Sequence, residues 1–283
     1  MYSAVVRSSL TYGAGVWHTP SQKNRTRSTG IEAPLDQYQN KGLRAVAGAF
    51  RATPIKALET ETFIPPLNVY LDSHLAAFRT RLAGSGLGGV IERQCERLKQ
   101  RLQRRRHTRQ TVQRGADRDQ WTKDWLETAA PSEGTATPKE ACLWHWTLRW
   151  NGQARRTNIC IEPPSRKAVQ RHKNLYKAES AMVVQIRTGK IGLAKFLCDM
   201  NVPDFPSPTC RKCGQGEETA IHLLFYCDSL RTERGQLREG GRLDIQKLLT
   251  TKKGFKKIGK WMIQYAGIDQ FRLSGFLFYG RPD

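Results

Sequence analysis

The chain has 283 residues, and its 47 lysines and arginines against 25 aspartates and glutamates give a formal net charge of +22 at pH 7. This length allows two modest domains, and we find no apolar stretch long enough to cross a membrane. The charge exceeds what solubility requires and indicates a polyanionic partner, with nucleic acid as the first candidate. An anionic membrane surface is less favoured, because the positive charge is mostly arginine and is spread along the chain.

Cysteine usage indicates a reducing compartment. The chain contains seven cysteines, an odd number that suits free thiols better than a disulfide framework. Arg7 and small polar residues interrupt any apolar run near the N-terminus, so we expect no secretory signal. We therefore expect an intracellular protein of the nucleus or the cytoplasm.

Residues 1–83 are predicted to form a small helical unit. Apolar residues recur there at helical spacing, and polar or proline-containing stretches separate the helical segments. The predicted helices cover residues 1–17, 34–50, 54–58 and 67–82.

Residues 84–174 are predicted to be a basic connector, helical in part and irregular in part. The segment 84–89 (GSGLGG) is typical of a hinge. An arginine face on the following helix is predicted to contact nucleic-acid phosphates, although a solvated charged face fits it equally well. Adjacent cations repel one another unless anions lie nearby, which favours phosphate contact. The arginines of this face are Arg93, Arg97, Arg101, Arg104, Arg105 and Arg106.

Residues 175–283 are predicted to form a small C-terminal helical region. Apolar residues again follow helical spacing, and no run of alternating polar and apolar residues predicts a strand anywhere in the chain. The expected fold class is therefore mainly α. The helices predicted in this region cover 175–187, 190–200, 220–230, 243–249 and 255–265.

Three cysteines and a histidine in this region have the spacing of a zinc site, Cys210-x2-Cys213-x8-His222-x4-Cys227. Thiolate and imidazole are the usual protein ligands of zinc, and the two-residue gap allows the first two sulfurs to reach one ion. Because the protein fills all four coordination positions, we predict one structural zinc ion in a knuckle over 203–231. Four unrelated residues, three of them ordinary buried thiols, are the alternative.

The predicted knuckle also carries candidate nucleic-acid contacts. Arg211 and Lys212 follow the first ligand and are predicted to face phosphates. Phe225 and Tyr226 precede the last ligand and could stack on bases. Burial under the knuckle is the alternative, favoured slightly for Phe225 and evenly balanced for Tyr226. RNA, DNA or both are the expected partners.

Several further segments carry a resemblance to a known family. They are residues 12–17 (YGAGVW), the block 39–67 with its LETE and PPL motifs, and residues 185–189 (QIRTG). With the CCHC pattern, these segments resemble the C-terminal part of reverse transcriptases from non-LTR (LINE-type) retrotransposons, particularly fungal ones. The resemblance does not extend through the middle of the chain, roughly 86–174.

The resemblance implies a thumb-like region over 1–83, the connector over 84–174, and a terminal zinc knuckle within 175–283. It also implies RNA binding, with the polymerase domain of the parent element as a partner. The family is an RNA-directed DNA polymerase whose active site contains an Asp-Asp pair that binds magnesium. No such pair occurs in this sequence, so we predict no catalytic residue and no polymerase activity of the chain alone.

Two other functions stay open at this point. A divergent metal-dependent nuclease would need paired carboxylates, and Asp199 and Asp204 are the nearest such pair. An inert, truncated relic of the element would fit the arginine-rich middle of the chain. The function that we expect is a nucleic-acid-binding portion of the reverse transcriptase.

Overall fold

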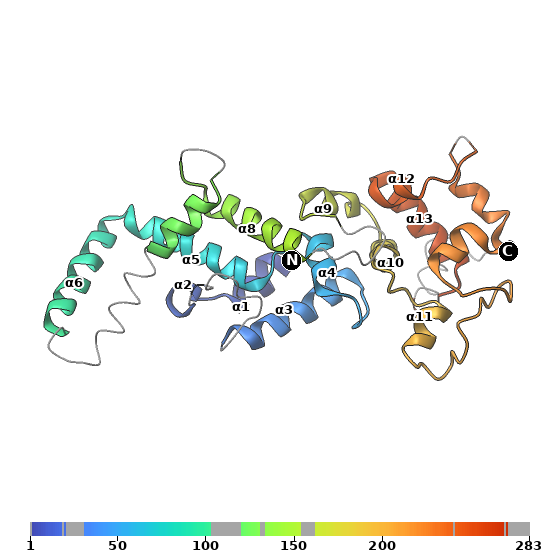
Figure 1. Ribbon diagram of the computed structural model, residues 1–283, viewed down its shortest axis with the longest axis horizontal. Helices are drawn as coiled ribbons and strands as arrows, with labels where there is room; N and C mark the ends of the chain where they lie inside the picture. Colours follow the sequence, from blue (N-terminus) through green and yellow to red (C-terminus); the bar gives the residue numbers. More distant parts are fainter. Residues whose placement is uncertain are drawn as a thin grey trace. The chain divides into compact units, whose positions relative to one another are not determined.

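The computed structural model describes most of the chain (Figure 1). In the described part the protein is mainly helical, as predicted, and β structure is limited to two isolated bridges, Thr209–Glu217 and Glu239–Arg242. No helix among the described residues is long and apolar enough to cross a membrane. The described residues are 2–18, 20, 31–102, 120–130, 134–153, 162–239, 241–268 and 270.

The helices pack into two compact units that interleave along the sequence. The first unit contains residues 1–39 and 65–153, and the second contains residues 40–64 and 154–283. The three regions predicted at 1–83, 84–174 and 175–283 were defined by composition and resemblance. They stay a prediction about function, separate from this division by packing.

Helix α5 (Leu67–Ala83) is the centre of the first unit and lies beside α8 (Pro138–Gln153). Between these helices, Ser73 Oγ donates to the backbone oxygen of Pro138 at 2.9 Å. Helix α2 (Ala14–Trp17) packs on α5 at Gly15, where a Cβ atom would lie 2.9 Å from the Phe78 ring. The other elements with residues in this unit are η1 (Tyr2–Val6), α1 (Arg7–Leu10), α3 (Glu32–Ala47) and α6 (Gly86–Leu102).

The glycine-rich segment 84–89, predicted as a hinge, forms a tight turn between two helices and the start of the second. Helix α5 ends at Ala83, and α6 already begins at Gly86. A Cβ atom on Gly88 would lie 1.9 Å from the backbone oxygen of Leu82. Glycine is therefore required at this position for close backbone approach, which its missing side chain allows.

A buried histidine links three parts of the first unit. His18 is fully buried, with Nδ1 2.8 Å from Glu32 Oε1 of α3 and Nε2 2.8 Å from Asp72 Oδ1 of α5. Burial alone would lower the pKa of His18, but the hydrogen bonds and charges of Asp72 and Glu32 outweigh it and raise the pKa. When protonated, the imidazolium donates to both carboxylates and ties the N-terminal segment to both helices.

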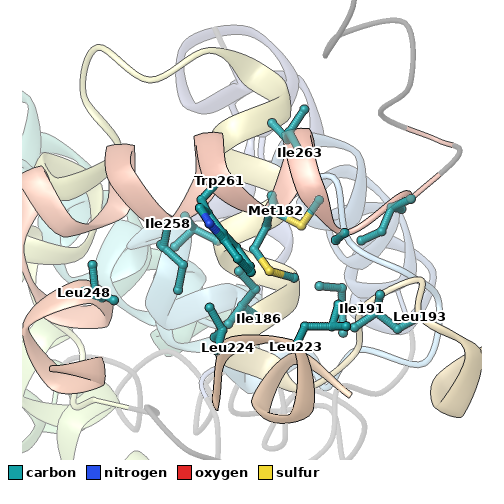
Figure 2. Packing of buried hydrophobic residues seen from close by; sticks show 14 of the residues in the cluster. Met182, Ile186, Ile191, Leu193, Leu223, Leu224, Leu248, Ile258, Trp261 and Ile263 are labelled. Atoms are coloured by element: carbon teal, nitrogen blue, oxygen red, sulfur yellow. The ribbon is translucent and has the colours of Figure 1, made fainter. Parts of the chain in front are cut away.

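The core of the second unit lies between α10 (Lys177–Thr188) and α13 (Lys252–Tyr265). Figure 2 shows Met182 and Ile186 of α10 against Ile258 and Trp261 of α13. The remaining elements with residues in this unit are the second half of α3, α4 (Ile55–Thr62), α9 (Arg166–His172), α11 (Ala194–Asp199), η3 (His222–Tyr226), η4 (Asp228–Leu230), η5 (Glu233–Leu237) and α12 (Ile245–Thr250).

A buried ion pair attaches α4 to α10 inside this unit. Arg187 Nε donates to Glu61 Oε1 at 2.6 Å, and His172 Nε2 lies 3.4 Å from Glu61 Oε2. The same guanidinium also donates to the backbone oxygen of Leu249. Burial alone would raise the pKa of Glu61, but the hydrogen bond of His172 and the charge of Arg187 outweigh it and lower the pKa. The carboxylate is therefore buried in its charged form.

Candidate metal centre

The structure brings the four predicted zinc ligands together. The ligand atoms of Cys210, Cys213, His222 and Cys227 all lie within 4.8 Å of one another. The sulfurs of Cys210 and Cys227 are 3.9 Å apart, and Cys213 Sγ is 3.2 Å from His222 Nε2. Ligands placed tetrahedrally at about 2.0–2.3 Å from one ion are separated by about 3.3–3.8 Å. The group could therefore bind one metal ion.

A tight loop presents the first two cysteines. Cys210 N donates to the oxygen of Gly216 at 2.9 Å, and Gly214 N donates to the oxygen of Cys210 at 2.8 Å. Both glycines have positive φ, 69° at Gly214 and 65° at Gly216, which costs a glycine little. The isolated bridge between Thr209 and Glu217 closes this loop and directs both thiols to the same side.

The other two ligands lie at the ends of the short π-helical turn η3, which His222 begins and Cys227 follows. Cys227 N donates to the oxygen of His222 at 2.8 Å, which sets the fourth ligand one wide turn beyond the third. Thr219 Oγ1 accepts from His222 N at 3.0 Å and so satisfies an unpaired donor at the start of the turn. The His222 ring packs against Gly216, where a Cβ atom would lie 3.6 Å from Nδ1. These contacts fix the direction of the imidazole.

A buried carboxylate supports the loop from behind. Glu218 is 1% exposed and accepts from the backbone N–H of Arg211 at 2.7 Å and of Ala194 at 3.2 Å. The Arg211 guanidinium binds the same carboxylate at 2.8 Å and lies 5.0 Å from the centre of the Phe205 ring. Burial alone would raise the pKa of Glu218, but Arg211 and the backbone donors lower it. Glu218 therefore holds the first two ligands against the start of α11.

The candidate metal centre is continuous with the hydrophobic core. Cys210 and Cys227 are fully buried and belong to the same cluster as Leu223 and Leu224, which lie beneath Trp261 and Ile186 in Figure 2. Burial raises the pKa of the Cys227 thiol to about 12. A metal ion has to displace this proton, so its binding should weaken as the pH falls.

The other knuckle residues singled out in the sequence differ in exposure. Tyr226 is 69% exposed, whereas Phe225 is half-buried and packs against the core. Lys212 is exposed, and Ser229 Oγ donates to its backbone oxygen at 2.8 Å. Arg211 is exposed in part, but its guanidinium is held by Glu218. Tyr226 and Lys212 are thus the knuckle side chains best placed to meet a ligand.

The predicted arginine face is only partly described. Arg93 and Arg97 are exposed on α6. Arg101 lies on the same helix, although its side chain is outside the described part of the chain. The triplet Arg104–Arg106 also lies outside the described residues, so its role stays a prediction.

The carboxylates named for a nuclease do not form a further cluster. Asp199 is exposed and pairs with Lys195 at 3.2 Å, and Asp204 is exposed in the loop that follows. In the described part of the chain, the Cys/His group is the only set of three or more potential metal ligands that come together. The nuclease alternative therefore gains no support from these residues.

Sequence analysis missed one basic surface in the second unit. Helix α13 carries five lysines and no acidic residue, and its apolar residues are buried in the core. The repeated spacing KK-x-x-KK-x-x-K was the signal that could have revealed it, because it places the lysines on one helical face.

Comparison of the chain with protein-family models, with curated protein sequences and with solved structures gave no significant match.

Proposed function

We propose that this chain binds nucleic acid with the help of one structural zinc ion. The observation that carries the proposal is the convergence of Cys210, Cys213, His222 and Cys227 within a strongly basic protein. Three thiolates and one imidazole favour zinc over the harder cations. Four protein ligands leave no position for a reactive water, so the ion has a structural role. We place the protein in the nucleus or the cytoplasm, where its thiols stay reduced.

The ion would fix the loop and the turn that carry the exposed side chains. Lys212 lies directly before the second ligand, and Tyr226 lies directly before the fourth. A phosphate contact from Lys212 would add affinity without sequence preference, while stacking of a base on Tyr226 is worth about 1–3 kcal/mol. The exposed Arg93 and Arg97 would add further phosphate contacts from the first unit.

We further propose that the chain is the C-terminal portion of a non-LTR retrotransposon reverse transcriptase. The sequence resemblance supports this assignment, as do the contacts between two of the segments that carry it. Glu61 of the LETE motif pairs with Arg187 of the QIRTG motif, as described above. In the parent enzyme this portion would hold template RNA or target DNA for the polymerase domain.

Equilibrium binding of the zinc-loaded chain to fluorescent single-stranded RNA, single-stranded DNA and duplex DNA tests the proposal. Affinity should fall steeply with salt, with a log–log slope of about −0.7 for each phosphate contact on a single strand. The metal-free Cys213→Ser variant serves as the comparison and should bind more weakly. Absence of binding by the zinc-loaded chain, or a flat salt dependence, would contradict the proposed function.

A further inference from the structure

The outer side of α13 is a continuous lysine face. Phe255, Ile258, Trp261 and Met262 turn inward to the core of the second unit. At about 100° per residue, the five lysines fall within an arc of about 140° on the other side. Four of them are exposed and the fifth is half-buried. These lysines are Lys252, Lys253, Lys256, Lys257 and Lys260.

This lysine face leads into a pocket at the start of α12 and α13. The pocket has a volume of about 430 Å³, and Arg242, Lys247 and Lys253 contribute to its lining. Glu239 and Arg242 exchange two backbone hydrogen bonds of 3.0 and 3.2 Å, which hold both residues at its rim. At Gly254 a Cβ atom would lie 2.4 Å from the oxygen of Lys247, so glycine lets the two helices approach closely.

Three ammonium groups already surround one anion at this pocket. The carboxylate of Glu239 lies 2.6 Å from Lys247 Nζ, 3.5 Å from Lys253 Nζ and 3.8 Å from Lys257 Nζ. The hydrogen bond and charge of Lys247, with the charge of Lys253, lower the pKa of Glu239. With Arg242 and Asp244, which also line the pocket, four positive charges face two negative charges, which leaves an excess of two. The pocket is thus shaped and charged to hold an anion.

We infer that the lysine face of α13 and this pocket together bind the phosphodiester backbone of a nucleic-acid strand, with Glu239 as an internal competitor. The inference rests on the proposed nucleic-acid-binding function and assigns it a site beyond the knuckle. Lys252, Lys256 and Lys260 follow one another at about 6 Å along the helix, a spacing suited to successive phosphates. Lysine contacts a phosphate as a point charge, so this site reads no base sequence.

An anionic lipid surface would be attracted by the same charges. Helices that bind such surfaces insert an apolar face into the headgroup region. In α13 the large apolar side chains are committed to the core, and none of them belongs to the exposed face. The lysine face can therefore meet phosphates in water but offers no anchor for a membrane. A nucleic-acid strand fits this surface better than a lipid bilayer does.

Two variants of the full chain, loaded with zinc, test the site in opposite directions. Substitution of the three exposed lysines that follow one another along the helix (Lys252→Gln, Lys256→Gln and Lys260→Gln) should weaken binding of a 20-nucleotide single-stranded RNA about tenfold or more at 0.1 M salt. The log–log salt slope should become shallower by about 2, because about 0.7 is lost per phosphate contact. Glu239→Gln should instead strengthen binding about threefold, since it frees lysines for one further contact.

Glu162→Gln is the matched control for Glu239→Gln. Glu162 is a carboxylate of the same unit outside the knuckle, with a side chain 34% exposed and paired with Arg171 at 2.6 Å, and its substitution changes the net charge equally. Its RNA affinity should stay within about twofold of the unchanged chain, because it frees no lysine of α13. If both variants gain RNA affinity equally, the effect of Glu239 is one of net charge alone, and Glu239 does not compete with phosphate for the lysines.

The outcomes separate this site from the proposed function. If the unchanged chain binds RNA and the triple lysine variant binds it equally well, the site is overturned and the function stands. If the unchanged chain binds no nucleic acid, the function itself fails. Partial unfolding could lower the RNA affinity of the triple lysine variant, but it would not raise the RNA affinity of Glu239→Gln. A Glu239→Gln variant whose RNA affinity does not rise therefore counts against the site. If the triple lysine variant loses binding to phosphatidylserine vesicles but keeps its RNA affinity, the lysine face binds lipid and the site is overturned.

Discussion

Arg187 and Glu61 form a buried ion pair although 126 residues separate them in the sequence. Their side chains are 2% and 6% exposed. A buried charge is stable only when a partner compensates it, so this pair fixes how α4 lies against α10. It also gives a physical reason for the QIRTG and LETE motifs to occur in the same chain.

Removal of Arg187 should destabilise the protein strongly. Arg187→Met leaves the Glu61 carboxylate buried without its main partner, which should lower the free energy of unfolding by about 3–5 kcal/mol. Urea denaturation measures this change. The control is Lys195→Met, which breaks the more exposed contacts with Asp199 and Glu217 and should cost about 1 kcal/mol or less. Equal losses in the two variants would show that burial of the Arg187 pair is unimportant.

Loss of one cluster thiol should release the metal. Cys213→Ser removes a ligand from the candidate metal centre, so the purified variant should contain less than one zinc ion per chain and unfold more easily. Elemental analysis and the thiolate band of a cobalt-substituted sample measure occupancy. Cys198→Ser is the matched control, because Cys198 is a free thiol of α11 outside the cluster. A full zinc content in the Cys213→Ser variant would show that Cys213 is not a zinc ligand.

His18 should make stability depend on pH near neutrality. Its pKa is raised above the ordinary value of 6.5, so its stabilising effect is complete below that value. The effect is lost as pH rises through the higher pKa of the folded state, and the free energy of unfolding should fall over this window. The free energy of unfolding of His18→Gln, measured over the same pH range, is the comparison. The other histidines affect the pH dependence of both proteins, so the difference between them is due to His18. Identical pH profiles would contradict a charged His18 between Glu32 and Asp72.

Two neighbouring aromatic residues should have separable roles. Tyr226→Ala removes an exposed ring, so it should weaken RNA binding, by about 1–3 kcal/mol if the ring stacks on a base, and change stability by less than about 0.5 kcal/mol. Phe225→Ala removes a ring that packs on the core, so it should lower stability by more than about 1 kcal/mol. Binding isotherms and urea denaturation of both variants measure the difference. A Tyr226→Ala variant with unchanged affinity would remove this residue from the binding surface.

The sequence predicts well those features that depend on nearby residues. Helical spacing of apolar residues gave the mainly α fold, and α10, α12 and α13 occur close to their predicted ranges. The four candidate ligands lie within 18 consecutive residues of sequence, so their spacing alone predicts that they can meet. Loops of this length close at small entropic cost, which is why the pattern is informative.

Features that join distant residues could not be predicted in this way. No local pattern pairs His18 with Asp72, or Arg187 with Glu61, because such contacts depend on how the helices pack. The composition of 84–89 could not reveal the close approach at Gly88, because glycine serves both flexible linkers and close helix contacts. Only the position of Leu82 against Gly88 distinguishes the two.

The continuity between the candidate metal centre and the hydrophobic core has a cellular consequence. Since Cys210 and Cys227 share that core with Leu223 and Leu224, loss of the proposed ion would expose apolar surface in the core of the second unit. Chains made during metal starvation would then be prone to aggregation and to proteolytic clearance. Supply of the metal would thereby limit how much of this protein a cell accumulates.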